Sequence, residues 1–103
     1  MGESTTERSR DPALLILASL ASGPRHGYAM IEDIDRAAGV KLGPGTLYGA
    51  IARLEHRGLI APVESADRRR PYRLTAMGAA VLHQEIDALE RVVLLARRTG
   101  AHE

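Results

Sequence analysis

Three adjacent arginines, Arg68, Arg69 and Arg70, form the densest run of positive charge in the chain. Guanidinium groups bind phosphate oxygens in a forked geometry and enter narrow minor grooves of DNA. Residues 41–73 hold seven basic and three acidic groups, a net of +4, whereas the segments before and after them have nets of −2 and −1. This middle third therefore favours a polyanion as ligand. A merely solvated basic surface is the alternative on charge alone.

Residues 43–57 combine hydrogen-bond donors with small residues on one side of a predicted helix. Thr46, Tyr48 and Arg53 can donate to phosphates or base edges, and a helix N-terminus itself favours a phosphate. Small residues let such a helix approach a duplex closely, and they are Gly45, Thr46, Gly49 and Ala52. The chemistry that this face favours is readout of DNA by a helix.

The sequence contains no cluster typical of an enzyme or a metal site. Cysteine is absent, and the four histidines are too scattered to form a local pair of metal ligands. The glycine-rich run at residues 43–49 lacks the Lys-Ser or Lys-Thr pair of a phosphate-binding loop. We therefore expect no enzymatic activity, no cofactor, and neither catalytic nor metal-binding residues.

The chain has no segment that predicts membrane insertion or export. No apolar run approaches the ~20 residues that a membrane-spanning helix needs, and the polar N-terminus has no signal-peptide core. We expect a soluble, cytoplasmic protein with no membrane partner. Residues 1–10 are predicted to be a disordered arm, and residues 99–103 a disordered tail.

Four helices are predicted to position the basic groups. Asp11 is a good N-cap for the first helix, Pro12 suits its first turn, and Gly23 lies beyond its end. The third helix has a buried stripe opposite its polar face, formed by Leu47, Ala50, Ile51 and Leu54. The predicted helices cover residues 12–21, 26–38, 43–57 and 76–98.

A β-hairpin is predicted between the third and fourth helices. Two short apolar runs, residues 59–63 and 71–74, flank a polar turn that contains the three arginines. A proline in each run suits edge strands, and Pro71 leads us to expect that the second strand starts late. Because side chains alternate between the two faces of a strand, Arg73 is expected to point to the face opposite that of Tyr72 and Leu74.

The last helix carries an apolar seam. Leu82, Ile86, Leu89 and Val93 are spaced by 4, 3 and 4 residues, which is a heptad pattern. This seam docks on the first helix, pairs with a second subunit, or does both. The first helix is itself apolar on nearly every side and must be covered all round, which also indicates a dimer. The predicted dimer contacts are Leu14, Leu17, Leu82, Ile86, Leu89 and Val93.

The predicted fold is mainly α with a small β-hairpin. Three helices followed by a hairpin form a winged helix-turn-helix, which we place at residues 11–75. Residues 76–98 would then form a C-terminal dimerisation helix. In this arrangement the third helix enters the major groove of DNA, and the hairpin is a wing that reaches an adjacent groove or the backbone.

Several motifs resemble the PadR family of bacterial transcriptional regulators, of the short type with a single C-terminal helix. The match covers about residues 13–80 in the right order and spacing, and its motifs are His26-Gly27-Tyr28, Gly43-Pro44-Gly45-Thr46-Leu47-Tyr48, Arg53-Leu54-Glu55, Gly58-Leu59-Ile60 and Arg69-Arg70-Pro71-Tyr72-Arg73-Leu74-Thr75-Ala76-Met77-Gly78. The resemblance implies a homodimer that binds double-stranded DNA at an inverted repeat. It also implies repression that a small-molecule effector relieves.

The resemblance and the basic residues together predict a set of DNA contacts. Tyr28 lies near phosphate at the start of the second helix, while Thr46 and Tyr48 lie on the recognition helix. The alternative for both tyrosines is amphipathic packing with the hydroxyl at the surface. The predicted DNA-binding residues are Tyr28, Lys41, Gly45, Thr46, Tyr48, Arg53, Arg68, Arg69, Arg70 and Arg73.

Two functional alternatives follow from the same sequence. A winged helix can serve as a protein-binding adaptor without touching DNA, although such modules lack a basic wing. The chain has no Trp, so an effector stacked between tryptophans at a dimer interface, as in some short family members, does not apply. An effector pocket would be aliphatic, with Leu14, Leu17, Leu89 and Val93 as its expected lining. The operator, the regulated genes and the sign of regulation stay open.

Overall fold

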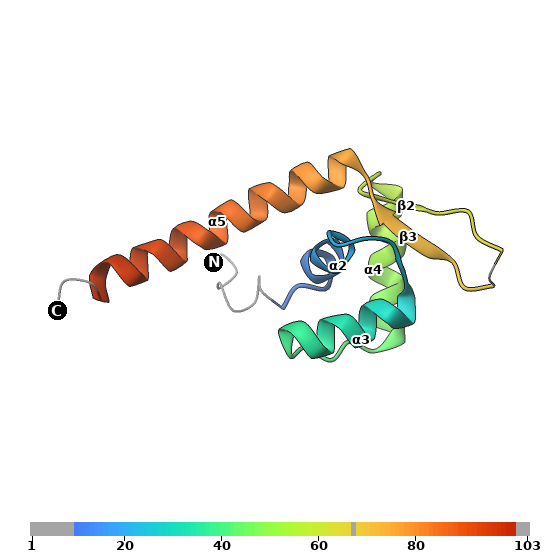
Figure 1. Cartoon of the computed structure of the whole chain (residues 1–103), viewed down its shortest axis with the longest axis horizontal. Helices are drawn as coiled ribbons and strands as arrows, with labels where there is room; N and C mark the ends of the chain where they lie inside the picture. The colour runs from blue at the N-terminus through green and yellow to red at the C-terminus, as the bar shows by residue number, and fades with distance from the viewer. Residues whose placement is uncertain (1–9, 67, 101–103) are drawn as a thin grey trace.

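The computed structural model describes residues 10–66 and 68–100 (Figure 1). The predicted arm lies outside the described residues except for Arg10, which is an exposed turn residue. Of the predicted tail, residues 101–103 lie outside them. The described part is mainly helical with a small antiparallel sheet, which confirms the predicted fold class.

The helices and short strands follow one another in the winged-helix order. The helices are α2 (Pro12–Leu20), α3 (Gly27–Ala38), α4 (Pro44–His56) and α5 (Ala76–Gly100). The strands are β1 (Arg25–His26), β2 (Ile60–Pro62) and β3 (Pro71–Leu74). The last helix ends two residues beyond the predicted limit of 98.

Local sequence signals begin and end the helices where expected. The Asp11 carboxylate accepts a hydrogen bond from the Ala13 N–H at 3.1 Å, and Pro12 opens α2. At the end of α3, Gly39 adopts a left-handed conformation with φ of 70°, and its N–H donates to the Asp35 carbonyl at 3.0 Å. Glycine tolerates this conformation without steric cost. The short connection that follows leads directly into α4.

The sheet has three strands, and the sequence predicted only two. Strand β3 lies in the middle, paired antiparallel with both β1 and β2. Pro71 is the first residue of β3, so the expectations of a late start and of an edge strand at this position were wrong. A proline at the first residue of a strand leaves the later ladder intact, and the Pro71 carbonyl still accepts from the Val63 N–H at 2.9 Å.

Helix α2 lies at the centre of the core. It contacts α3, α4, α5 and β3, so one chain covers most of its apolar surface. Side chains from α2, α3, α4 and β2 form the most deeply buried part of this core: Ile16, Met30, Leu47, Leu54 and Ile60. Full burial of each such side chain stabilises the folded state by about 1.5–3 kcal/mol relative to leaving it exposed to water.

The start of helix α5 is anchored to the body of the domain. The Thr75 hydroxyl accepts from the Gly78 N–H at 3.0 Å and donates to the Gly58 carbonyl at 2.7 Å. Gly78 packs directly on the Leu59 carbonyl, where a Cβ atom would overlap backbone. The C-terminal part of the helix projects away from the body of the domain (Figure 1).

Two of the predicted dimer residues belong to the core of a single chain. Leu17 is 3% exposed and Leu82 is 4% exposed. Their surface is already covered by the chain itself, and their contact with a partner stays a prediction. Leu14 and Leu89 are half-buried, and Ile86 and Val93 are exposed.

Candidate nucleic-acid interface

One face of α4 is buried and the opposite face is open. The stripe of Leu47, Ala50, Ile51 and Leu54 packs into the core as predicted. On the open face, Gly45, Thr46 and Arg53 are exposed. The Arg53 guanidinium folds back along the helix, and its Nη1 lies 3.6 Å from the place of a Cβ on Gly49. The open face therefore combines small residues with the positively charged side chain of Arg53, as readout of a duplex requires.

Two tyrosines join α4 to the start of α3. The rings of Tyr28 and Tyr48 pack edge to face, with centroids 6.5 Å apart and planes at 72°. Tyr28 is 60% exposed and Tyr48 is 42% exposed. The Tyr48 ring fits because Gly27 has no side chain: a Cβ there would overlap the phenol, whose Cε1 lies 2.8 Å away. Both hydroxyl-bearing rings are thus fixed at one surface.

His26 joins the start of α3 to the wing. Its Nδ1 accepts a hydrogen bond from the Ala29 N–H at 3.3 Å, which caps α3. Its Nε2 lies 3.3 Å from Nη1 of Arg69. Because a neutral imidazole has a single acceptor nitrogen, these two contacts draw on different tautomers of His26.

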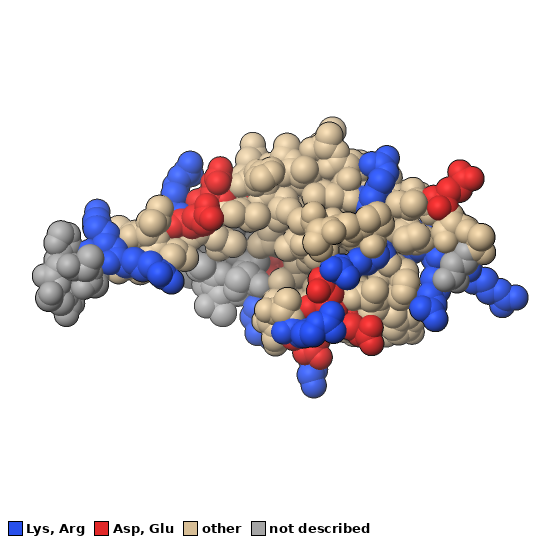
Figure 2. All heavy atoms as spheres, viewed as in Figure 1, with Lys and Arg blue, Asp and Glu red and all other residues tan. Residues whose placement is uncertain are grey.

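The basic side chains project from the wing and its surroundings. Arg68, Arg69 and Arg70, hereafter the arginine wing, are exposed, as are Lys41 and Arg73. Figure 2 shows Lys and Arg side chains reaching outward at the right-hand end of the molecule, where the β2–β3 hairpin lies. Exposed guanidinium groups can bind phosphate oxygens of a nucleic-acid backbone.

The chain matches the model of the Transcriptional regulator PadR-like family over residues 16–84, which is more than half of its length. The chain belongs to this family. PadR-family regulators bind DNA and are not enzymes, so the predictions of DNA binding and of no enzymatic activity are confirmed at the level of the family.

Two curated relatives differ in how much of their length the chain spans. Transcriptional regulator Rv3488 of Mycobacterium tuberculosis is 37% identical over 82 residues, which are 77% of this chain and 76% of that protein. An uncharacterised 37.1 kDa protein in transposon TN4556 of Streptomyces fradiae is 45% identical over 85 residues, or 82% of this chain. The chain spans only a quarter of the Streptomyces protein.

Solved structures of PadR-like regulators share the fold. A PadR family transcription regulator from Clostridium difficile has a TM-score of 0.76 at 22% identity, over 85% of this chain and 96% of that one. A transcriptional regulator from Clostridium thermocellum has a TM-score of 0.75 at 27% identity, over 95% and 97%.

The predicted contact residues of this PadR-like chain divide into a connected group and separate ones. Tyr28, Tyr48 and Arg69 are linked through Gly27 and His26. Lys41 and Arg73 are exposed at the surface, and within residues 10–66 and 68–100 their side chains have no hydrogen bond or ion pair. The sequence analysis did not predict that Tyr48 packs on Gly27 or that His26 contacts the wing, although Gly27 and His26 both lie in the His-Gly-Tyr motif.

Other kinds of site find little support in the described part of this PadR-like chain. None of the helices there is both long and apolar enough to cross a bilayer. Within the same residues, no three His, Cys, Asp or Glu side chains gather closely enough to hold a metal ion.

Proposed function

We propose that this chain is a homodimeric repressor that binds an inverted-repeat operator in double-stranded DNA and is released by a small-molecule effector. One observation carries the DNA-binding part of the proposal. The recognition helix, the start of α3 and the wing form one continuous surface, through Tyr48 on Gly27 and Tyr28, and through His26 beside Arg69.

Each part of this surface has a role that its chemistry supports. Helix α4 enters the major groove, where its small residues permit close approach and Thr46 and Arg53 meet base edges. The Tyr28 and Tyr48 hydroxyls donate to phosphates, which fix the register but carry no sequence information. The arginine wing adds affinity at an adjacent minor groove or backbone.

The homodimer is supported by the projecting part of α5. Ile86 is 37% exposed, Val93 is 47% exposed and Leu94 is 65% exposed. Helix α5 offers these apolar side chains to solvent beyond its last core residue, Leu82. A second copy of α5 would cover them as one self-complementary patch. A two-fold axis then demands an inverted repeat, with half-sites about 34–36 Å apart.

The effector is supported by a small cavity between α2, α4 and α5. Its volume is about 140 Å³, and its apolar lining includes Leu14, Leu17, Leu54 and Val81. Leu89 and Val93 do not line it, so half of the expected pocket is not part of this cavity. Sites for drug-sized ligands have about 300–1,000 Å³. An effector therefore needs a wall from the second subunit, which places it where it can alter the dimer.

Selection of duplexes from a random pool tests this proposal. The chain should enrich an inverted repeat whose half-site centres lie about 10–10.5 base pairs apart, and DNase footprinting should show protection over both halves. A reporter with the enriched site inside its promoter should be transcribed less when the chain is present. Enrichment of a single half-site would contradict binding as a dimer. If no sequence is enriched above a control selection without protein, the chain does not bind DNA sequence-specifically.

A further inference from the structure

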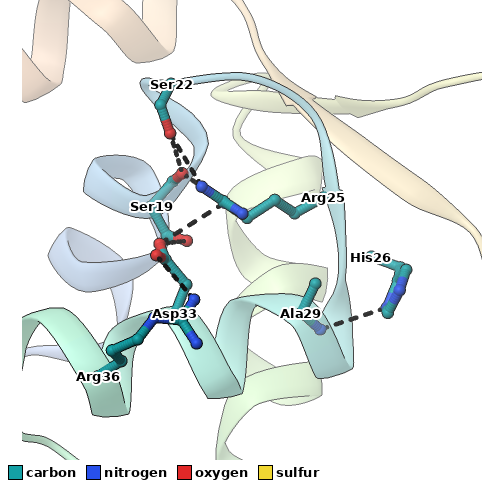
Figure 3. Close-up of polar contacts among 7 residues, drawn as sticks. All are labelled: Ser19, Ser22, Arg25, His26, Ala29, Asp33 and Arg36. Carbon is teal, nitrogen blue, oxygen red and sulfur yellow. Dashed lines mark hydrogen bonds and ion pairs between the residues drawn. The ribbon is translucent and has the colours of Figure 1, made fainter.

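A network of five polar side chains lies at the junction of α2, β1 and α3 (Figure 3). Its members are Ser19, Ser22, Arg25, Asp33 and Arg36. Its centre is Asp33 on α3, which accepts a hydrogen bond from the Ser19 hydroxyl of α2 at 2.6 Å. Ser19 is only 5% exposed. A short hydroxyl–carboxylate bond of this kind is charge-assisted and strongly directional. The network thus ties α2 to α3 from inside the domain.

Arg25 of β1 completes this network. Its Nε donates to the Ser19 carbonyl at 3.1 Å and lies 3.6 Å from the Asp33 carboxylate, while its Nη2 donates to the Ser22 hydroxyl at 3.0 Å. The Ser19 carbonyl belongs to the last turn of α2, where carbonyls lack helical partners and a cation is favourable. The guanidinium is therefore held by α2, by α3 and by the loop between them.

The backbone of the same residue belongs to the sheet that carries the wing. Arg25 pairs with Tyr72 and His26 with Pro71 across the β1–β3 ladder. His26 then caps α3 and lies beside Arg69. Two residues make too short a ladder to hold a strand unaided, so the half-buried side chain of Arg25 fixes where β1 lies.

We propose that Arg25, held by Ser19 and Asp33, is a positioning residue for DNA binding. It sets β1, and through β1 the wing and the start of α3, relative to the recognition helix. The inference rests on the proposed DNA-binding function. Arg25 itself points into the α2–α3 junction and its side chain is 29% exposed, so it acts through other residues and not as a phosphate ligand.

The test compares Arg25→Met with Arg36→Met. Arg36 also pairs with Asp33, at 3.9 Å, but its side chain is 72% exposed and it has no bond to β1. Both variants lose one positive charge, so long-range attraction to DNA falls equally. On the duplex enriched by selection, we expect Arg25→Met to bind at least about tenfold more weakly, and Arg36→Met to stay within about threefold of the wild type. Equal losses in the two variants overturn the proposal.

A double-mutant cycle separates positioning from general structural damage. In a chain whose arginine wing is replaced by alanines, the loss caused by Arg25→Met should shrink to about threefold or less. Additive losses, within about twofold, overturn the proposal because they mean that Arg25 acts independently of the wing. Thermal unfolding of each variant confirms that the folded protein is what binds.

Ser19→Ala keeps the proposal testable if Arg25→Met does not fold. It removes one hydroxyl from the network and leaves Arg25 and Asp33 in place. We expect a smaller loss of affinity that also shrinks when the arginine wing is removed, and a loss that does not shrink overturns the proposal. Failure of the wild type to bind any duplex would instead refute the proposed function, so the two failures are distinguishable.

Discussion

The phenol ring of Tyr48 lies on the backbone of Gly27, in space that any side chain at position 27 would fill. This contact joins the recognition helix to the first turn of α3. It also holds Tyr48 at 6.5 Å from Tyr28, ring centroid to ring centroid. The geometry of the two exposed tyrosines therefore depends on a buried glycine.

Gly27→Ala is expected to weaken DNA binding without unfolding the protein. The new methyl group displaces the Tyr48 ring, which is partly exposed and free to swing outward. Alanine in the first turn of a helix is itself favourable relative to glycine. We predict a loss of about tenfold in affinity for the selected duplex, measured by fluorescence anisotropy, with a melting temperature near that of the wild type.

The matched control for this variant is the same change in a Tyr48→Ala chain. Without the ring, the methyl group at position 27 has room, so Gly27→Ala should cost no further affinity. An equal cost in both backgrounds would mean that Gly27 acts by some route other than Tyr48.

Gly49→Ala is expected to raise stability and lower DNA affinity together. Gly49 lies inside α4, where alanine is favoured over glycine by about 1 kcal/mol, and the new Cβ would contact Arg53 Nη1 at an ordinary 3.6 Å. The same methyl group stands on the face that we place against the duplex. Urea unfolding and anisotropy titrations check the two effects. A stabilised variant with unchanged affinity would show that this turn of α4 stays clear of DNA.

Val93→Lys is expected to convert the proposed dimer to a monomer. Val93 is 47% exposed on the proposed seam of α5, where a second copy would bury the added charge without a partner. Sedimentation velocity measures the mass directly. Ala88→Lys is the matched control, because Ala88 is exposed and lies about a third of a turn away from the seam. A dimeric Val93→Lys chain would refute this seam.

Much of the fold follows from signals within a few residues of one another. Asp11 with Pro12, and Gly39 after α3, define helix ends through local hydrogen bonds and backbone conformation. The 3.6-residue period of α4 separates a buried stripe from an open face. These features depend on near neighbours in the chain, so the sequence alone was sufficient to predict them.

The sequence did not predict features that depend on distant contacts. Strand β1 has two residues, which is too short for any periodicity, and it exists because β3 lies beside it. The bond between Ser19 and Asp33 joins residues 14 positions apart on two helices. The heptad spacing of Leu82 is equally consistent with a dimer seam and with packing inside one chain. Only the structure shows that Leu82 is buried within the chain.

In the proposed function, the arginine wing contacts phosphates as part of a DNA-binding surface. The direct measurement is the dependence of DNA affinity on salt for the wild type and for a chain with Arg68→Ala, Arg69→Ala and Arg70→Ala. Each phosphate contact adds about 0.9 to the slope of log K against log salt. A chain with Arg91→Ala, Arg97→Ala and Arg98→Ala is the control, because it loses the same charge from exposed positions on α5.

We predict that the wing variant loses up to about 2.7 from the magnitude of this slope, together with affinity for all duplexes alike. The α5 control should keep the slope of the wild type. An unchanged slope in the wing variant, or an equal reduction in the control, would contradict the placement of the wing against DNA.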